Sequence, residues 1–363
     1  MTDIDTVTTS NGMQLSGRPC LGLLIFTAAF CLILPALWPS VERLETGPDY
    51  RIPYAVGNDY WLYDRWAREA SRTCDTLLVG DSVVWGHFVA REQTLSHHMN
   101  AVEGSARFAN LGVDGSHPAA LAGLIEFHGK SFGDRKIVLL CNPTWMASTD
   151  QDLRNPDLRR DQVFPYNHAP LIPQFRPAVP CYRETFSGRI GHVLDRNLPF
   201  NAWTRHLQVA YYENKSIPAW TLDHPYENPL KPMTLRLGPA DDRLEESISW
   251  TERGIRKQDT PWVDLESSLQ WGEFRRTVRL LRSRGNPLLV VVGPYNEHLL
   301  TEPSLKRYLA LKKGVEAWLA SEKVPHLLPP PLPSGTYADA SHPLDAGYAL
   351  MARQVLAHEF FKR

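Results

Sequence analysis

Residues 76–86 of the chain are Thr76-Leu77-Leu78-Val79-Gly80-Asp81-Ser82-Val83-Val84-Trp85-Gly86. The apolar start is typical of a short buried strand, and the glycine and polar residues that follow predict a turn into a helix. A serine at such a junction has its hydroxyl at the carboxyl edge of a sheet, beside the unpaired amides of the helix. A second interpretation is a plain turn in which Asp81 or Ser82 caps the helix.

The same order of strand, turn and helix recurs along the chain. Units at 107–128 and 136–145 follow the first one. A later unit has a helix near 265–284, a strand at 288–292 and a helix at about 303–321. Strands that alternate with helices predict an α/β fold with a mainly parallel sheet.

A second pair of reactive side chains lies near the carboxyl terminus, where Asp339 and His342 stand three residues apart before a predicted amphipathic helix. A carboxylate can hold an imidazole in one tautomer, and the imidazole can then take a proton from a serine. An Asp-x-x-His pair alone is usually part of a surface loop. Together with Ser82 it predicts a triad in which Ser82 is the nucleophile, His342 the base and Asp339 the orienting acid.

These segments resemble sequence blocks of the SGNH (GDSL-type) hydrolases. Gly80-Asp81-Ser82 is similar to their first block, and Asp339-Ala340-Ser341-His342-Pro343 with Gly347-Tyr348 is similar to their last. Asn110-Leu111-Gly112-Val113-Asp114-Gly115 is similar to the block whose final glycine donates a backbone N–H to the oxyanion. The resemblance therefore implies the amides of Ser82 and Gly115 as oxyanion donors. It covers about 75–145 and 285–363.

One block departs from the family pattern. The family has Gly-x-Asn-Asp there, whereas the predicted strand 136–140 is followed by Cys141-Asn142-Pro143-Thr144. Asn142 keeps the amide side chain, and we expect it to be the third oxyanion donor. Pro143 has a fixed φ angle and also restricts the backbone conformation of Asn142. The alternative is that Asn142 is a turn residue only.

Composition limits the classes of partner. The chain has 363 residues, enough for one sizeable α/β domain with an insertion or for two modest domains. Its formal net charge is −1 and it contains no long basic run, which argues against a nucleic-acid partner. It has no Walker loop, dinucleotide-binding glycine motif or metal-ligand spacing, so we expect neither a cofactor nor a metal. His87, one turn beyond Ser82, is interpreted as a partly exposed helix residue.

The amino-terminal region contains an apolar segment at 20–39 without a charged residue. About twenty such residues can cross a bilayer as a helix, and Trp38 suits the interface. We expect a single membrane anchor after an N-terminal tail at 1–19. A cleaved signal peptide is the alternative, but it would have a shorter apolar core and a more basic leader. The charges that flank the segment, Arg18 before it and Arg43 after it, do not determine an orientation.

The rest of the chain divides around a long middle segment. We expect a linker at 40–72, the first part of an SGNH-like core at 73–146 and its second part at 265–363. Residues 147–264 interrupt the alternation of strands and helices and are rich in proline and aromatic residues. Such a composition predicts an ordered insertion, which we expect to cap a cleft over the carboxyl edge of the sheet.

The resemblance implies a three-layer α/β/α, flavodoxin-like domain and acyl-ester chemistry. It implies a membrane-anchored serine acyl-ester hydrolase or O-acyltransferase that acts outside the cytoplasm, in the periplasm, on an envelope or extracellular glycan. Similar anchored proteins work with a multi-span membrane acyltransferase in alginate or teichoic-acid modification, which implies such a partner here. Two alternatives stay open: a stand-alone carbohydrate or lipid esterase, and a non-catalytic binding or assembly partner of the acyltransferase.

Overall fold

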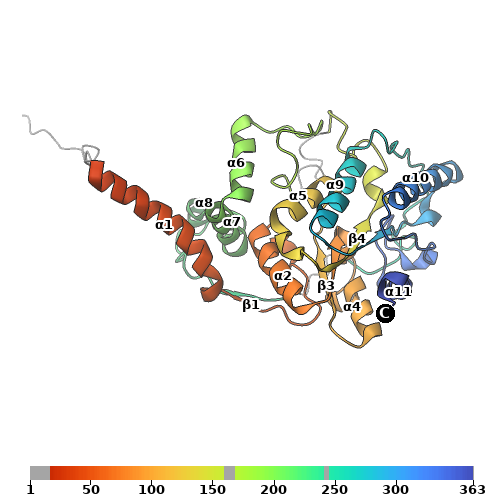
Figure 1. Ribbon diagram of the computed structural model, residues 1–363, viewed down its shortest axis with the longest axis horizontal. Helices are drawn as coiled ribbons and strands as arrows, with labels where there is room; N and C mark the ends of the chain where they lie inside the picture. The colour runs from red at the N-terminus through yellow and green to blue at the C-terminus, as the bar shows by residue number, and fades with distance from the viewer. Residues whose placement is uncertain (1–16, 159–167, 241–244, 363) are drawn as a thin grey trace, which may run out of the picture.

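The predicted α/β fold with a mainly parallel sheet is confirmed by a computed structural model, which describes residues 17–158, 168–240 and 245–362 (Figure 1). Most of the predicted N-terminal tail, 1–19, lies outside the described residues. The strands are β1 (Arg43–Leu44), β2 (Thr76–Gly80), β3 (Phe108–Gly112), β4 (Lys136–Cys141), β5 (Arg236–Leu237), β6 (Leu288–Val292) and β7 (His326–Leu327). The α-helices are α1 (Gly17–Val41), α2 (Tyr60–Thr73), α3 (Ser82–Trp85), α4 (Leu95–Glu103), α5 (Pro118–His128), α6 (Phe186–Asn197), α7 (Pro199–Tyr211), α8 (Ile217–Asp223), α9 (Leu269–Ser283), α10 (Glu302–Ser321) and α11 (Asp345–Leu356).

The main sheet has five parallel strands in the order β3-β2-β4-β6-β7. Strand β3 pairs with one edge of β2, and β4 pairs with its other edge. The direction in which successive strands are added to the sheet therefore reverses between β2 and β4. Ligands of open parallel sheets bind at the carboxyl ends of the strands, at such a switch point. Ser82 directly follows the turn after β2, and Asn142 directly follows β4. The strand order therefore brings both residues to this point.

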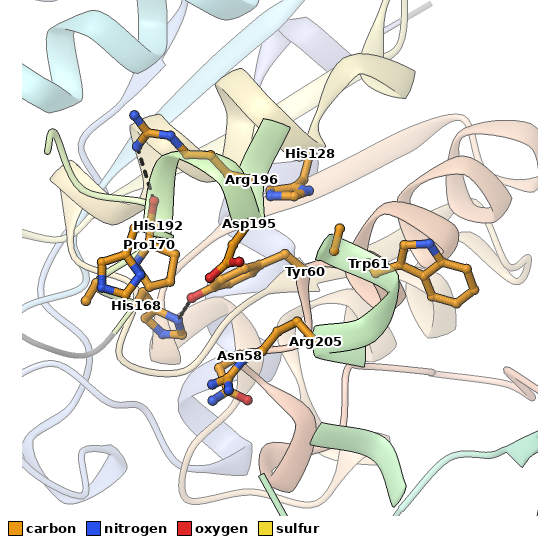
Figure 2. A pocket seen from close by; sticks show the side chains of 12 residues that line it. Asn58, Tyr60, Trp61, His128, His168, Pro170, His192, Asp195, Arg196 and Arg205 are labelled. Atoms are coloured by element: carbon orange, nitrogen blue, oxygen red, sulfur yellow. Dashed lines mark hydrogen bonds between the residues drawn. The ribbon is translucent and has the colours of Figure 1, made fainter. Parts of the chain in front are cut away.

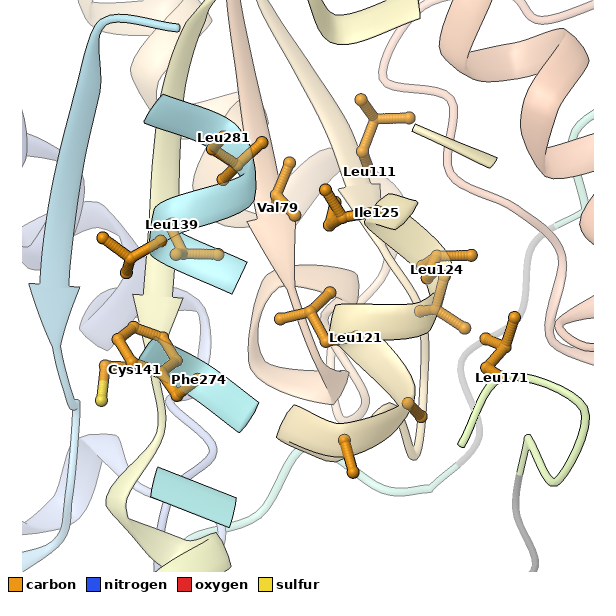
Figure 3. Close-up of a cluster of buried hydrophobic side chains, with 14 of the residues drawn as sticks. Val79, Leu111, Leu121, Leu124, Ile125, Leu139, Cys141, Leu171, Phe274 and Leu281 are labelled. Carbon is orange, nitrogen blue, oxygen red and sulfur yellow. The ribbon is translucent and has the colours of Figure 1, made fainter. Parts of the chain in front are cut away.

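Helices cover both faces of this sheet. Strands β2, β3 and β6 are buried along their whole length, as expected for parallel strands between two helical layers. Helices α2, α5, α9 and α10 pack on one face, and α4 and α11 pack on the other. Figure 3 shows part of the first face, where Leu121 and Ile125 of α5 and Phe274 of α9 lie against Val79 and Leu139 of the strands.

Several segments agree with the predicted elements. The predicted helices at 265–284 and 303–321 are found as α9 and α10, and the predicted strand at 288–292 is β6. The predicted linker at 40–72 contains α2, whose buried residues belong to the same hydrophobic core as the sheet. This segment therefore folds as part of the domain, because the apolar face of α2 packs on the core and on α5 and α7.

Segment 147–264 packs on several parts of the domain, and our expectation that it caps a cleft over the carboxyl edge stays a prediction. Leu153, Leu171 and Tyr182 extend the core that contains α5 and α9. Helix α7 packs against α1 and α2, and α6 packs against α7 (Figure 1). Part of the apolar surface of the segment is thus buried against the domain and the end of α1, whereas other apolar side chains, such as Phe186, Leu222 and Tyr226, are exposed. The part of the segment that comes near Ser82 and His342 begins at Glu245, as described below.

Helix α1 is long and apolar enough to span a membrane, from Cys20 to Val41. Its amino-terminal part projects away from the domain, and its carboxyl-terminal end lies beside α7 (Figure 1). Trp38 of α1 makes an edge-to-face contact with Trp203 of α7, with ring centroids 5.4 Å apart. The apolar segment therefore ends in contact with the folded domain.

A buried group of charged side chains holds the end of α1. Glu42, the residue after α1, has no exposed surface, and its carboxylate accepts hydrogen bonds from Arg65, Tyr211 and His206. His206 Nδ1 is 2.6 Å from Oδ2 of Asp59, the residue that caps α2. Burial acts to lower the pKa of His206, but the two carboxylates outweigh burial and raise this pKa to about 9. The charged imidazole thus links α1, α2 and α7.

Replacing His206 tests this link. His206→Gln leaves the buried Asp59 carboxylate without its cation and leaves Glu42 with Arg65 alone, so we expect it to lower the free energy of unfolding by about 3 kcal/mol below pH 6.5. Because the folded-state pKa is about 9 and the unfolded value is about 6.5, the stabilisation by the imidazolium is full below pH 6.5 and is lost as the pH rises through 9.

The difference in thermal stability between wild type and variant should therefore shrink between pH 6.5 and 9.5. It can be measured by thermal unfolding of the full chain in detergent. The control is His298→Gln, at an exposed histidine, which should change stability little at either pH. A difference for His206→Gln that does not depend on pH would contradict a charged His206.

Candidate active site

The three side chains predicted as a triad lie in hydrogen-bond contact with one another. His342 Nε2 is 2.8 Å from Ser82 Oγ, and His342 Nδ1 is 2.8 Å from Asp339 Oδ2. Ser82 begins α3, whereas Asp339 and His342 lie in the loop before α11. The fold thus brings together two segments that are 260 positions apart. In this geometry His342 can take the proton of the Ser82 hydroxyl while Asp339 holds the other ring nitrogen.

The electrostatics of the pair suit proton transfer. Burial acts to raise the pKa of Asp339, but the His342 charge and hydrogen bonds outweigh burial and lower this pKa to about 2. Burial acts to lower the pKa of His342, but the Asp339 carboxylate outweighs it and raises this pKa above its usual value. Asp339 also accepts the backbone N–H groups of Ser341 and His342 at 2.8 and 2.9 Å, which fixes the loop. A charged, fixed carboxylate therefore stabilises the protonated imidazole.

The carboxylate of Asp81 fixes the start of α3. It is buried, and its Oδ1 accepts the Val83 N–H at 3.0 Å. Its Oδ2 accepts from Asn142 Nδ2 and from Trp145 Nε1, both at 2.7 Å. Burial raises the pKa of Asp81, and the three donors oppose that shift. Because Asn142 and Trp145 follow β4, Asp81 ties the end of β2 to the end of β4 and so holds Ser82 between them.

Asn142 lies beside the triad but is occupied by structural hydrogen bonds. Its Nδ2 donates to Asp81, and its Oδ1 accepts the Thr144 N–H at 3.0 Å. An amide nitrogen carries two hydrogens, so Nδ2 keeps one further N–H for an oxyanion. The structure therefore gives the side chain both the predicted position and the role of a turn residue, since Asn142 also caps the short 3₁₀ helix at Pro143–Met146.

Gly115 lies in the loop after β3, on the other side of β2. The loop starts alongside β2, where the Val113 N–H donates to the Gly80 carbonyl at 3.1 Å. Gly115 has a φ of +70°, which is the left-handed region that favours glycine. Its carbonyl accepts the His117 N–H at 3.0 Å at the start of α5. The predicted donor thus stands at the same edge of the sheet as Ser82.

Arg51 supports α3 from the segment predicted as a linker. This side chain is buried, and its Nη1 donates to the carbonyls of Trp85 and Gly86 at 2.8 and 2.7 Å. Its guanidinium carbon lies 3.9 Å from the centroid of the Trp85 ring. A cation that binds the last carbonyls of a helix stabilises the end of that helix. No pattern around Arg51 in the sequence indicates this role, because its partners are more than 30 positions away.

His87 and Asp114 form a second pair beside the triad. His87 Nδ1 is 2.6 Å from Asp114 Oδ1, and the His87 ring centroid is 5.4 Å from that of His342. His87 is partly exposed, as expected, but it lies in the turn after α3 and not in a helix, and its ring borders the site. The signal in the sequence is only that His87 follows Ser82 by about one helical turn and that Asp114 precedes Gly115.

The access to Ser82 is narrow. Ser82 is 8% exposed, and the Phe88 ring lies 5.3 Å from the His342 ring. Segment 245–253 packs on this side, since Ser247 donates to the Phe88 carbonyl and Arg253 lies 4.5 Å from the centroid of the Phe88 ring. This segment is the part of the predicted insertion that contributes to the walls of the site.

Comparisons with known proteins give no name to this arrangement. The sequence matches no protein-family model and no curated protein. The geometry of the site therefore carries the functional conclusion.

The backbones of β3 and α3 lie close together at Gly112 and Trp85, and this contact positions α3. A Cβ atom at Gly112, the last residue of β3, would lie 2.3 Å from the Trp85 backbone nitrogen. Gly112→Ala should therefore push β3 from α3 and lower the free energy of unfolding by about 2 kcal/mol.

The matched control is Gly191→Ala in α6, where a Cβ would meet no atom within 4 Å. This change should be neutral or stabilising, because alanine favours a helix more than glycine does. Thermal unfolding of both variants gives the comparison, and equal stability of the two would refute the close packing of β3 on α3.

Proposed function

We propose that this chain is a membrane-anchored SGNH-type serine enzyme that transfers acyl groups from or to a glycan, as an ester hydrolase or an O-acyltransferase. The observation that carries the proposal is the continuous hydrogen-bonded chain from Ser82 through His342 to Asp339. The parallel sheet with helices on both faces supports a three-layer, SGNH-like domain. The helix α1 supports an anchor. The resemblance to SGNH hydrolases is the only ground for placing the domain on the periplasmic or extracellular side.

The proposed reaction has two halves. In the first, Ser82 Oγ attacks the ester carbonyl while His342 Nε2 takes the serine proton, and Asp339 stabilises the imidazolium. The amides of Ser82 and Gly115, together with the free N–H of Asn142, bind the oxyanion. The intermediate then collapses, the leaving alcohol takes the proton from His342, and the acyl group stays on Ser82 as an ester.

In the second half, His342 removes a proton from an acceptor oxygen, which attacks the acyl-enzyme and releases Ser82. Water as the acceptor gives hydrolysis, and a sugar hydroxyl gives transfer. Ordering the acceptor and excluding water both promote transfer, and the small exposed fraction of Ser82, 8%, is compatible with such a site. A multi-span membrane acyltransferase is the proposed partner that supplies the acyl group.

Removal of the nucleophile tests the chemistry. Ser82→Ala should abolish ester hydrolysis and acyl transfer by the full chain, measured as acetate release from an acetylated polysaccharide and as acetyl transfer to a glycan. The control is Ser105→Ala, at an exposed serine before β3, which should leave both activities unchanged. Undiminished activity of Ser82→Ala would contradict the mechanism, and a wild type inactive toward both substrates would favour a non-catalytic assembly role.

The pH dependence of the rate tests the role of Asp339. Only neutral His342 can act as a base, and its pKa is raised above 6.5, so kcat/KM should rise with pH through an apparent pKa above 6.5. Asp339→Asn removes the charge that raises this pKa. We expect the rising limb to move to lower pH and the maximal rate to fall about 10³- to 10⁴-fold. If Asp339→Asn lowers the maximal rate but leaves the apparent pKa of the rising limb of the pH profile unchanged, Asp339 acts only through folding.

A further inference from the structure

A cavity of about 290 Å³ lies apart from the triad, between the start of α2, the end of α5, and helices α6 and α7 (Figure 2). This volume is near the lower end of the range of small-molecule sites, roughly 300–1,000 Å³. Its walls combine aromatic side chains with polar ones that converge on the space. The residues that line it are Asn58, Tyr60, Trp61, His128, His168, Ala169, Pro170, His192, Asp195, Arg196, Ala202 and Arg205.

His128 lines this cavity, and its ring also carries a buried polar atom without a partner. The side chain is 6% exposed, and its Nε2 has no hydrogen-bond partner among the described residues. Its ring stacks on Tyr60, with centroids 5.4 Å apart, so the ring is held in place. Burial lowers the pKa of His128 to about 4, which leaves the imidazole neutral at physiological pH. A buried nitrogen without a partner is costly, but this atom has almost no accessible surface, so His128 contributes its ring and not its nitrogen to the wall of the cavity.

The charges around the cavity favour an anion with one charge. Arg196 and Arg205 line it together with a single acid, Asp195. Burial lowers the pKa of His168 and of His192, so both imidazoles tend to be neutral. The described lining therefore has one net positive charge. Guanidinium groups bind carboxylates through paired hydrogen bonds.

The remaining walls suit a compact ring with hydroxyl groups. Tyr60 provides aromatic surface and Asn58 adds an amide, whereas the Trp61 ring, although part of the lining, packs on His206 with centroids 4.4 Å apart. His168 Nε2 lies 2.8 Å from the carbonyl oxygen of Asp114 and donates to it. His168 Nδ1 then accepts from the Tyr60 hydroxyl at 2.9 Å. One wall of the cavity is therefore bonded to the residue that precedes Gly115.

We propose that this cavity is a second binding site, separate from Ser82, that takes one monosaccharide-sized organic anion with a carboxylate, that is, a sugar acid. Arg205 binds the carboxylate, and Asp195 and Asn58 bind hydroxyl groups. If the proposed acyl chemistry holds, the site selects acidic glycans and holds a unit of the polymer at a distance from the reacting one.

Calorimetric titration of the full chain in detergent tests the proposal. The probe is D-glucuronate, and D-glucose and inorganic phosphate are the comparison ligands. We expect saturable binding of glucuronate and binding at least about tenfold weaker for glucose, which lacks the charge. Phosphate should also bind more weakly, because it offers no ring to the aromatic wall.

Two variants assign the binding to this cavity. Arg205→Gln removes the cation and should weaken glucuronate binding about tenfold or more. Asn58→Ala removes the amide that binds a hydroxyl, so it should weaken binding while the thermal stability of the free protein stays the same. The matched control is Arg279→Gln, at an exposed arginine of α9 outside the cavity, which should bind glucuronate like wild type.

The outcomes separate this proposal from the catalytic one. Ser82→Ala should bind glucuronate like wild type, since Ser82 does not line the cavity. The absence of saturable glucuronate binding, or equal weakening by Arg279→Gln, would overturn the proposal without touching the triad. Preferential binding of phosphate, or of vesicles that contain an anionic lipid, would assign the cavity to a phosphate group instead and would also overturn it.

Discussion

The buried carboxylate of Asp81 is the interaction on which the geometry of the site depends. It accepts hydrogen bonds from Val83 at the start of α3 and from Asn142 and Trp145 after β4. A buried carboxylate is stable only when such donors surround it, so the ends of β2 and β4 cannot separate without a large cost. The same contacts orient α3, and through it Ser82 toward His342. The site therefore stands on the two central strands of the sheet and not on a mobile surface loop.

A similar buried cluster fixes the apolar helix to the domain. Glu42, His206 and Asp59 join the end of α1 to α7 and α2. If α1 spans a membrane, this cluster sets the direction in which the domain leaves the bilayer and the height of Ser82 above it. Helices α6 and α7 then form a connection between the anchor and the core, and the second cavity lies within that connection.

Much of the fold and the triad could be predicted from the sequence, because both depend on local patterns. Apolar runs followed by glycine gave the central strands, and the spacing of Asp339 and His342 indicated their pairing. The position of segment 147–264 could not be predicted, since its prolines and aromatic residues have no period that indicates which surface they cover. Sequence analysis also missed the roles of Arg51, Asp114 and the Glu42–His206 pair. Each of these residues acts through a partner that is far away in the sequence, so no local pattern indicates the contact.

The central claim is that Ser82 carries the acyl group during the reaction. The most direct measurement is to incubate the full chain with p-nitrophenyl acetate, quench with acid and locate the acetyl group by mass spectrometry of peptides. A Ser82-based mechanism predicts acetylation on the peptide that contains Ser82, and its absence when Ser82 is replaced by alanine. Hydrolysis of the ester with Ser82 unmodified, or with the acetyl group on another residue throughout the reaction, would contradict it.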